Sequence, residues 1–450
     1  MLVKIIVDNF LSFETETELT MIPSNKTRKK VEHKISVKST SLLKYAVIYG
    51  ANAAGKSNLI EAFKFIKYCV NKAIPVESMT MFCKTSESNS VRPSLFEIQF
   101  TINDKFYAYG FSLILSERTI HSEWLYELYQ NGSSKALFER EAGHKPKLGD
   151  GLNLNSMDTA KMNTYLEDFE ETSDLLFLTF MNNGKKYNKN SKLIFLKEVF
   201  DWICNGLTIC TPQTSLTNFE YYYDDASLSA INELIRTFDT GITEIGIDEI
   251  SIDELRQELP APIFDDLMND LKKKSEEDGS SNFKLSMRSN HNFFNLEFQK
   301  GKEPKITTIR LKHGKSFYSY KFKEESDGTR RLFELLDMLL NKGNHKVYVI
   351  DEMERSLHPK LTSKFIELFD RLHCNQKMQL IFTTHESSIM DQELFRRDEI
   401  WFVERDKDNS SHIYSLDKFK ERYDKKLSKA YLEGRYGAIP VFTSFNFKGE

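Results

Sequence analysis

The stretch GANAAGKS, residues 50–57, has the residue types and spacing of a phosphate-binding loop, G-x-x-x-x-G-K-[ST]. Gly50 and Gly55 allow backbone N–H groups to curl around phosphate oxygens, and Lys56 brings a positive charge to the β- and γ-phosphates. The hydroxyl of Ser57 is placed to ligate Mg²⁺, and a helix that starts here adds a partial positive charge. The pattern indicates binding of ATP with Mg²⁺, against the alternative of a glycine-rich turn that happens to carry a lysine.

Two carboxylates follow an apolar run far downstream, in KVYVIDE. An enzyme with a phosphate-binding loop needs an acid at such a strand end to hold Mg²⁺, and a second group to orient or deprotonate the attacking water. Asp351 suits the first role and Glu352 the second. The alternative is a strand that merely ends in solvent.

A third chemical group, His385, ends the apolar run QLIFTTH. Isolated histidines are usually structural or solvated. At the carboxyl end of a strand in an open α/β sheet, however, a side chain lies where ligands bind. His385 is therefore predicted to hydrogen-bond the γ-phosphate and to sense its loss.

A second candidate anion site lies at the start of a helix predicted over 327–342. Ser326 and Gly328 would offer a hydroxyl, free N–H groups and a helix dipole. Because one ATP does not need two phosphate-binding helix starts from the same chain, we infer that this one binds the ATP of a second copy. Plain N-capping by Ser326 or Asp327 is the alternative, and capping alone does not explain the glycine.

These groups must be positioned by alternating strands and helices. A buried strand ends at Gly50, and apolar residues at helical spacing follow it as far as Pro75. Residues 94–130 predict antiparallel strands with a turn at Asn131-Gly132, and residues from 316 onward alternate strand and helix, which implies a parallel sheet. The fold class predicted is α/β, with a mixed sheet, flanking helices, an antiparallel sub-sheet and a mainly helical insertion.

Composition limits the class of protein. The chain has 450 residues, a net charge of −4 and five cysteines without CxxC spacing, so we expect a reducing compartment and no zinc or disulfide framework. The N-terminus has no signal-like apolar region, and no apolar run approaches the roughly 20 residues of a membrane span. A cytoplasmic protein without a membrane partner is expected.

The order of NF-SF, GANAAGKS, ESDGTRR, VIDEMERSLHP and TTHESS resembles that of ABC-type ATPase heads, in the branch with SMC and DNA-repair ATPases. The segments DE-E-SLHP and YLEGRYGAIP (431–440) are similar to a prokaryotic branch, the AAA/ABC-type ATPases of abortive-infection and anti-phage systems. Those ATPases are encoded beside a toxin or nuclease. The resemblance covers about residues 1–70 and 316–445.

The resemblance implies an ATPase that forms a homodimer or higher homo-oligomer, with each ATP held between the phosphate-binding loop of one chain and the signature helix of the other. It divides the chain into an N-terminal lobe (1–190), a helical insertion or arm (191–310) and a C-terminal lobe (311–450). Glu352 and His385 would be catalytic, and Ser57 and Asp351 would hold the metal. The nucleotide-binding residues implied are Gly50, Asn52, Ala53, Ala54, Gly55, Lys56, Ser57, Asn58, Ser326 and Gly328.

Three positions depart from the family pattern. Leu11 replaces the usual basic residue of NF[KR]SF, and His358 stands where many ABC proteins carry aspartate. For the Q-loop of the family there are two candidates, Gln99 near the end of LFEIQF and the segment LFLTFMNN.

Two functions follow from the resemblance. The first is an ATPase of an anti-phage system that controls a separate effector, such as a nuclease or toxin, because the insertion is short and no nuclease motif is present. The alternative is an SMC-like DNA-binding repair or chromosome-maintenance ATPase, with basic runs at 26–30 and 184–192 as candidate DNA contacts. A transporter ATPase subunit is a weaker third reading, since such chains lack this insertion.

Overall fold

The computed structural model describes most of the chain, and it divides these residues into two compact units. The first unit comprises 1–214, 343–354 and 373–450, and the second comprises 215–342 and 355–372. The described residues are 1–27, 29–38, 40–169, 174–212, 225–277, 282–289, 292–299, 303–341, 343, 345–420 and 426–440.

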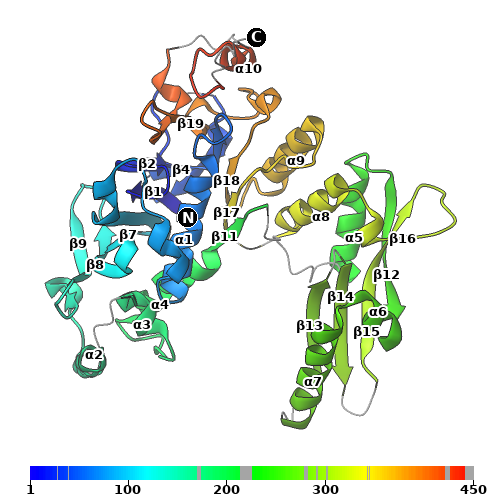
Figure 1. The fold of residues 1–450 in the computed structure, drawn as a ribbon, viewed down its shortest axis with the longest axis horizontal. Coiled ribbons are helices and arrows are strands. Elements are labelled where there is room, and N and C mark those ends of the chain that lie inside the picture. The colour runs from blue at the N-terminus through cyan, green and yellow to red at the C-terminus, as the bar shows by residue number, and fades with distance from the viewer. Residues whose placement is uncertain are drawn as a thin grey trace, which may run out of the picture. The chain divides into compact units, whose positions relative to one another are not determined.

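The central element of the first unit, in the described residues, is a six-stranded sheet that is parallel except for its last strand (Figure 1). Its strand β5 consists entirely of buried residues, as a strand covered on both faces requires. The order is β11 (Leu207–Cys210), β17 (Val347–Ile350), β18 (Gln379–Thr383), β5 (Tyr45–Tyr49), β19 (Ile400–Arg405) and antiparallel β20 (Ser411–Ser415).

A second sheet of the same unit is antiparallel and has seven strands in the part of the chain that is described. The turn predicted at Asn131-Gly132 is confirmed, because it joins β8 to β9 with Gly132 at φ +82°. The order is β10 (Lys147–Leu148), β9 (Ser134–Glu141), β8 (Thr119–Leu128), β7 (Lys105–Ile114), β6 (Ser94–Ile102), β1 (Leu2–Asp8) and β2 (Thr17–Thr20).

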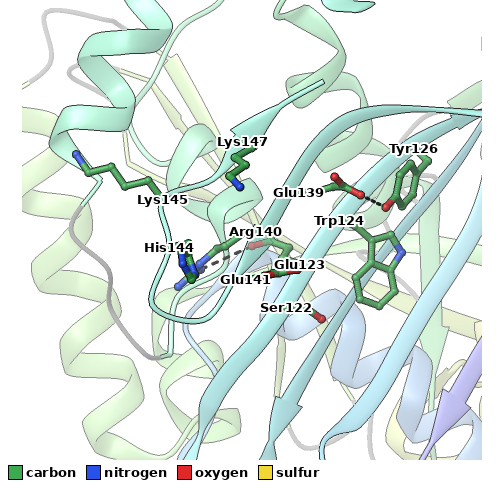
Figure 2. A pocket seen from close by; sticks show the side chains of 10 residues that line it. All are labelled: Ser122, Glu123, Trp124, Tyr126, Glu139, Arg140, Glu141, His144, Lys145 and Lys147. Carbon is green, nitrogen blue, oxygen red and sulfur yellow. Dashed lines mark hydrogen bonds and ion pairs between the residues drawn. The ribbon is translucent and has the colours of Figure 1, made fainter. Parts of the chain in front are cut away.

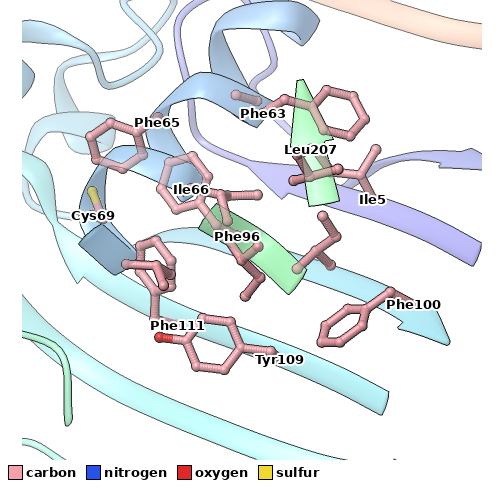
Figure 3. Close-up of a cluster of buried hydrophobic side chains, with 14 of the residues drawn as sticks. Ile5, Phe63, Phe65, Ile66, Cys69, Phe96, Phe100, Tyr109, Phe111 and Leu207 are labelled. Carbon is pink, nitrogen blue, oxygen red and sulfur yellow. The ribbon is translucent and has the colours of Figure 1, made fainter. Parts of the chain in front are cut away.

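Helix α1 (Lys56–Asn71) supplies the apolar face that joins the two sheets. Its residues Phe63 and Ile66 are buried in one cluster with Phe96 of the antiparallel sheet (Figure 3). Ile48 of the parallel sheet belongs to the same cluster. A buried amide adds a polar link: Gln379 at the start of β18 bonds the N–H and C=O of Leu2 at 2.7 and 3.0 Å. Other elements of this unit are β3 (Lys34–Val37), β4 (Thr40–Leu43), α2 (Ser156–Asp168), α3 (Phe177–Asn182), α4 (Ile194–Asp201) and α10 (Leu427–Leu432).

The second unit combines helices with an antiparallel sheet. Its sheet has the order β12-β15-β14-β13, with β16 paired to β15, among the residues described. The elements are α5 (Asp225–Arg236), β12 (Ile242–Ile250), α6 (Ile252–Glu258), α7 (Ala261–Glu277), β13 (Asn282–Ser289), β14 (Asn292–Gln299), β15 (Lys305–His313), β16 (Tyr320–Lys321), α8 (Asp327–Leu340) and α9 (Pro359–Leu372).

The predicted α/β class with mixed and antiparallel sheets is confirmed, but two details of the insertion differ. Besides helices α4 to α7, the region 191–310 contains a sheet that was not predicted, because the segments 282–289, 292–299 and 305–313 pair as strands and bury Phe294 and Leu296. The predicted boundary at 191 also differs, because β11 pairs in parallel with β17 and so joins residues 191–214 to the first unit. Among the described residues, no helix combines the length and apolar character needed to cross a bilayer.

Candidate nucleotide-binding site

Three neighbouring parallel strands end at the same edge of the six-stranded sheet. The phosphate-binding loop follows β5, His385 follows β18, and Asp351 with Glu352 follows β17. Because the sheet order is β17-β18-β5, the ends of these strands are adjacent, although β5 lies about 300 residues before β17 in sequence. This edge is where open α/β sheets bind ligands.

The glycines of the phosphate-binding loop are required by close backbone approaches. A Cβ on Gly50 would lie 2.5 Å from the carbonyl oxygen of Val403. Gly55 has φ +111°, and a Cβ there would collide with the hydroxyls of Ser411 and Ser12. Gly55 is the N-cap of α1, and in the part of the chain described no side chain caps this helix start. A helix terminus of this kind leaves its first N–H groups able to bind an anion.

The loop residues differ in exposure. Asn52, Ala53 and Ser57 are exposed, and Asn58 is half-buried. Ala53 has φ +61°, a left-handed conformation that bends the loop around its centre. Ala54 is buried, and its carbonyl accepts a hydrogen bond from Ser411 at 2.6 Å.

Lys56 is 5% exposed and turns back over the loop. Its Nζ donates to the carbonyls of Gly50 and Ala51 at 2.9 and 3.0 Å and lies 3.4 Å from Nδ1 of His385. Burial lowers the pKa of Lys56 to about 8, although the carboxylates led by Asp351 oppose the shift. The positive charge is therefore held in the loop without an anion close enough to restore its ordinary pKa.

Asp351 and Glu352 are linked through a threonine that sequence analysis missed. Thr383, the last residue of β18, donates its hydroxyl to Asp351 Oδ1 at 2.6 Å and accepts from the N–H of Glu352 at 2.8 Å. Asp351 is buried, whereas Glu352 is half-buried and has φ +49°. The chain therefore turns sharply after Asp351, and the two carboxylates occupy different environments.

His385 is held by a second residue that the motifs did not single out. The N–H of His385 donates to Glu354 Oε1 at 2.6 Å, and the other carboxylate oxygen, Oε2, is buried with no hydrogen-bond partner among the residues that the structure describes. Burial and then the charge of Lys56 lower the pKa of His385, so the imidazole is neutral at physiological pH. The repeated acid in DEMER and the threonines before His385 were the available sequence signals for Glu354 and Thr383.

Mg²⁺ fits the residues at this edge. The Ser57 hydroxyl and the Asp351 carboxylate are the oxygen ligands that Mg²⁺ takes from phosphate-binding proteins, which complete its coordination with water and phosphate. Asp351 is oriented by Thr383, as an orienting contact behind a ligand should do.

The second candidate anion site, Ser326 with Gly328, belongs to the other compact unit. Ser326 is exposed and caps α8, since its hydroxyl accepts from the N–H of Thr329 at 3.1 Å. A Cβ on Gly328 would lie 2.5 Å from the backbone oxygen of Ser356. The close contact with Ser356 therefore explains Gly328 within a single chain. The inference that this glycine points to a second copy of the chain loses that support.

The SLHP segment starts α9. The carbonyl of His358 accepts from Leu361 at 2.8 Å, its Nδ1 accepts from the N–H of Lys360 at 3.2 Å, and Pro359 takes the first helical position. His358 therefore serves as the helix cap at the place where many related proteins carry aspartate.

Other predicted contacts lie elsewhere. Gln99 lies in β6 and donates to Glu97 at 2.8 Å, and the competing segment forms α3. In the basic run at 26–30, Lys26 is 3.8 Å from Asp417 and Lys29 is 3.5 Å from Glu393. These lysines already have acidic neighbours, which weakens the run as a DNA contact. Arg28 lies outside the described residues.

In the run at 184–192, Lys185 is folded against the protein. Its Nζ donates to the carbonyl of Phe180 at 2.7 Å and lies 3.4 Å from the centre of the same ring. Burial lowers the pKa of Lys185. The neighbouring carbonyl of Lys186 accepts from Lys161.

A separate cavity of about 270 Å³ lies over β8 and β9 (Figure 2). Its buried charges are Glu123 and Arg140, 3.8 Å apart. Glu123 accepts from the N–H groups of Phe177 and Leu178 at 2.6 and 3.0 Å, which fixes the start of α3. Burial raises the pKa of Glu123. This pair holds a helix in place, and we assign it no ligand.

A comparison with models of protein families shows the family to which this chain belongs. Residues 46–145 and 195–391 match the family described as "AAA domain, putative AbiEii toxin, Type IV TA system". The chain belongs to this AAA family. The matched ranges hold the phosphate-binding loop, Asp351, Glu352, His385 and the α8 start, so the predicted kinship with prokaryotic ATPases of toxin systems is confirmed. A comparison with curated proteins gives no match.

Solved structures of SMC heads are similar to this AAA-family chain at low identity. An SMC head bound to the C-terminal winged-helix domain of ScpA has 13% identity and a TM-score of 0.41, over 92% of this chain and 97% of that chain. The SMC head domain from Thermotoga maritima has 12% identity and a TM-score of 0.33, over 92% and 98%. An SMC head with an extended coiled coil, bound to the C-terminal domain of ScpA from Pyrococcus furiosus, has 12% identity and a TM-score of 0.35, over 96% and 99%.

The lowered pKa of Lys56 predicts how ATP binding by this AAA-family protein depends on pH. Below pH 8 the lysine is charged before and after binding, whereas above pH 8 binding of a polyanion must draw a proton onto it. The ATP affinity should therefore fall as pH rises above 8, by up to about tenfold per unit. Calorimetry in two buffers of different ionisation enthalpy should record proton uptake near pH 9. An affinity that is constant from pH 7 to 9.5 would contradict this prediction.

The close approach of the Ser356 backbone to Gly328 predicts that a side chain at position 328 destabilises the protein. Gly328→Ala places a Cβ against the backbone of Ser356, which cannot rotate away, so the strain should exceed the ~0.5–1 kcal/mol that alanine normally gains over glycine in a helix. The free energy of unfolding should fall by roughly 1–3 kcal/mol, measured by urea titration with circular dichroism. Gly246→Ala is the matched control in the same unit, because no atom lies within 4 Å of its Cβ position. Equal stability of the two variants would exclude the tight contact.

Proposed function

We propose that the protein binds and hydrolyses ATP at the edge formed by β5, β18 and β17. The observation that carries this proposal is the convergence of Lys56, His385 and the Asp351–Thr383 pair from three strands distant in sequence. The membership in an AAA family supports nucleotide binding by the chain. The outward N–H groups of the loop and the charge of Lys56 would hold the phosphates.

In this proposal each side chain has a separate task. Bound Mg²⁺, held by Ser57 and Asp351, would neutralise charge on the phosphate oxygens. Glu352, half-buried and with a left-handed backbone conformation, is the group that accepts a proton from the attacking water. His385 presents a neutral imidazole beside Lys56 and donates a hydrogen bond to the γ-phosphate.

We further propose that two copies of the chain enclose each ATP. The exposed start of α8 supports this arrangement, because Ser326 uses its hydroxyl to accept one N–H and can still donate its proton to a phosphate oxygen. The packing of Gly328 on Ser356 holds that helix start against the segment that follows the catalytic acids in sequence. Binding and release of ATP would thereby change the association of the two copies.

The biological setting proposed is an abortive-infection or anti-phage system in which the ATPase controls a separate effector, such as a nuclease or toxin. The family description, which names a toxin system, supports this setting. The SMC-like DNA-binding alternative receives less support, because Lys26, Lys29 and Lys185 have partners within the chain.

Glu352→Gln tests the catalytic assignment. The amide keeps the shape of the side chain but cannot accept the proton, so ATP hydrolysis should fall about 100-fold or more while ATP stays bound. Phosphate release and light scattering should show a slow enzyme that accumulates as a dimer. Glu393→Gln, which changes an exposed glutamate, should behave as the parent. Hydrolysis by Glu352→Gln at the parental rate would overturn the role of Glu352.

Mixing two inactive variants tests whether the site is shared between copies. Lys56→Ala removes the phosphate contact, and Ser326→Asp keeps an N-cap but puts a carboxylate beside the phosphate. Each variant alone should hydrolyse no ATP. In an equal mixture half of the dimers are mixed and carry one intact site, so roughly a quarter of the parental rate should return. A mixture that stays inactive, or Ser326→Asp acting as the parent, would contradict the shared site.

A further inference from the structure

A cavity of about 410 Å³ lies beside the first turn of α1. This volume falls within the roughly 300–1,000 Å³ of small-molecule sites. The residues that line it include Leu11, Ser12, Asn58, Phe82, Lys84 and Arg405. All of them belong to the first compact unit.

The cavity shares a wall with the phosphate-binding loop. Asn58 directly follows the predicted metal ligand Ser57, and its side-chain amide donates to the hydroxyl of Ser12 at 2.7 Å. The Oγ atoms of Ser12 and Ser411 lie 2.7 Å apart, and Ser411 donates its hydroxyl proton to the carbonyl of Ala54 at 2.6 Å. The Ser12–Asn58 side of the cavity and the phosphate-binding loop are thus one hydrogen-bonded structure.

The sheet order shows on which side of the phosphate-binding loop the cavity lies. The acids and His385 follow β17 and β18, which lie on one side of β5. Arg405 ends β19, on the other side of β5. A triphosphate with its γ-phosphate near Lys56 and His385 would therefore direct its opposite end toward the cavity.

The lining has the chemistry of a nucleoside site. Phe82 is half-buried, with one part packed on the core and the rest facing the cavity. Lys84 and Arg405, both exposed, bring positive charge from two separate segments, and Asp408 is the acid in the lining. Aromatic faces stack on nucleobases, and paired cations bind phosphate oxygens.

The segment that carries Phe82 and Lys84 is fixed by a fully buried amide. Asn9 donates to the carbonyls of Asn89 and Arg92 at 2.8 and 2.9 Å, and it accepts from the N–H of Cys83 at 3.1 Å. The N–H of Leu11 adds a bond of 2.7 Å to the carbonyl of Met81. The cavity wall is therefore preformed, which reduces the entropy lost on binding.

We propose that this cavity binds the nucleoside end of the nucleotide, with the base stacked on Phe82 and with Lys84 and Arg405 paired to the phosphate oxygens nearest the ribose. The inference rests on the proposed function, since it assigns the other half of the same ligand. It also gives Leu11 a role as an apolar wall, with the positive charge supplied by residues far from it in sequence.

The test compares ATP with inorganic tripolyphosphate, which has no nucleoside, by equilibrium binding in the presence of Mg²⁺. Phe82→Leu keeps the apolar packing but removes the stacking face, so it should weaken ATP binding about tenfold and leave tripolyphosphate binding unchanged. Phe82→Tyr should restore ATP binding. Lys84→Ala and Arg405→Ala should each weaken ATP binding several-fold. Lys407→Ala, an exposed lysine that follows β19 and does not line the cavity, is the matched control.

The outcomes separate this inference from the proposed function. Parental ATP affinity in Phe82→Leu would overturn the nucleoside site and leave the ATPase standing. An equal loss for ATP and tripolyphosphate would also overturn it, because Phe82 would then act through the phosphate-binding loop. A parent protein that binds neither ligand would refute the proposed function, and the nucleoside site with it.

Discussion

Parallel pairing of β17, β18 and β5 is the constraint on which the candidate site depends. The segments that follow these strands contribute Asp351 with Glu352, His385 and the phosphate-binding loop, which lie in three separate parts of the sequence. The hydroxyl of Thr383 and the carboxylate of Glu354 then connect neighbouring strand ends at atomic distance. The sheet brings the candidate site residues close together, and the side chains of Thr383 and Glu354 orient Asp351, Glu352 and His385.

The phosphate-binding loop is supported from behind as well as from the sheet. Val403 prevents any side chain at Gly50, and Ser12 with Ser411 packs against Gly55. The NFLSF loop therefore contributes structure through its serine and through Asn9, two positions that carry no charge. Leu11 is the position at which this segment departs from the family pattern. The hydrogen bonds of the segment are made instead by Asn9 and Ser12.

Sequence reasoning predicted the elements whose signals are local. The phosphate-binding loop is a complete motif within eight residues, and α9 lies in the region from 316 onward where alternating strands and helices were predicted, with Pro359 and the following apolar spacing to mark it. At the start of the region predicted to alternate strand and helix, the segment 316–322 contributes only the two residues of β16, and Phe317 and Tyr318 are exposed, because alternation alone does not show whether a partner strand exists. The sheet of the second unit was not predicted. Its strands carry many charged residues and follow segments with helical spacing, so the whole region was interpreted as helical.

Features made by distant residues could not be read from the sequence. Gly328 needs the backbone of Ser356, the Lys56 environment needs His385, and the cavity wall needs Asn9. Each of these contacts depends on a backbone path that no local pattern specifies. The motifs gave the identities of most candidate site residues, whereas the structure gave their supporting contacts.

The pairing of β5 has a consequence for biosynthesis. Both neighbours of this strand, β18 and β19, come from the last quarter of the chain, more than 300 residues after the phosphate-binding loop. A ribosome-bound chain therefore carries a complete nucleotide motif with neither adjacent strand in place. The sheet around this motif can form only after β18 and β19 have been synthesised, and a product truncated before them retains the motif without either of its neighbouring strands.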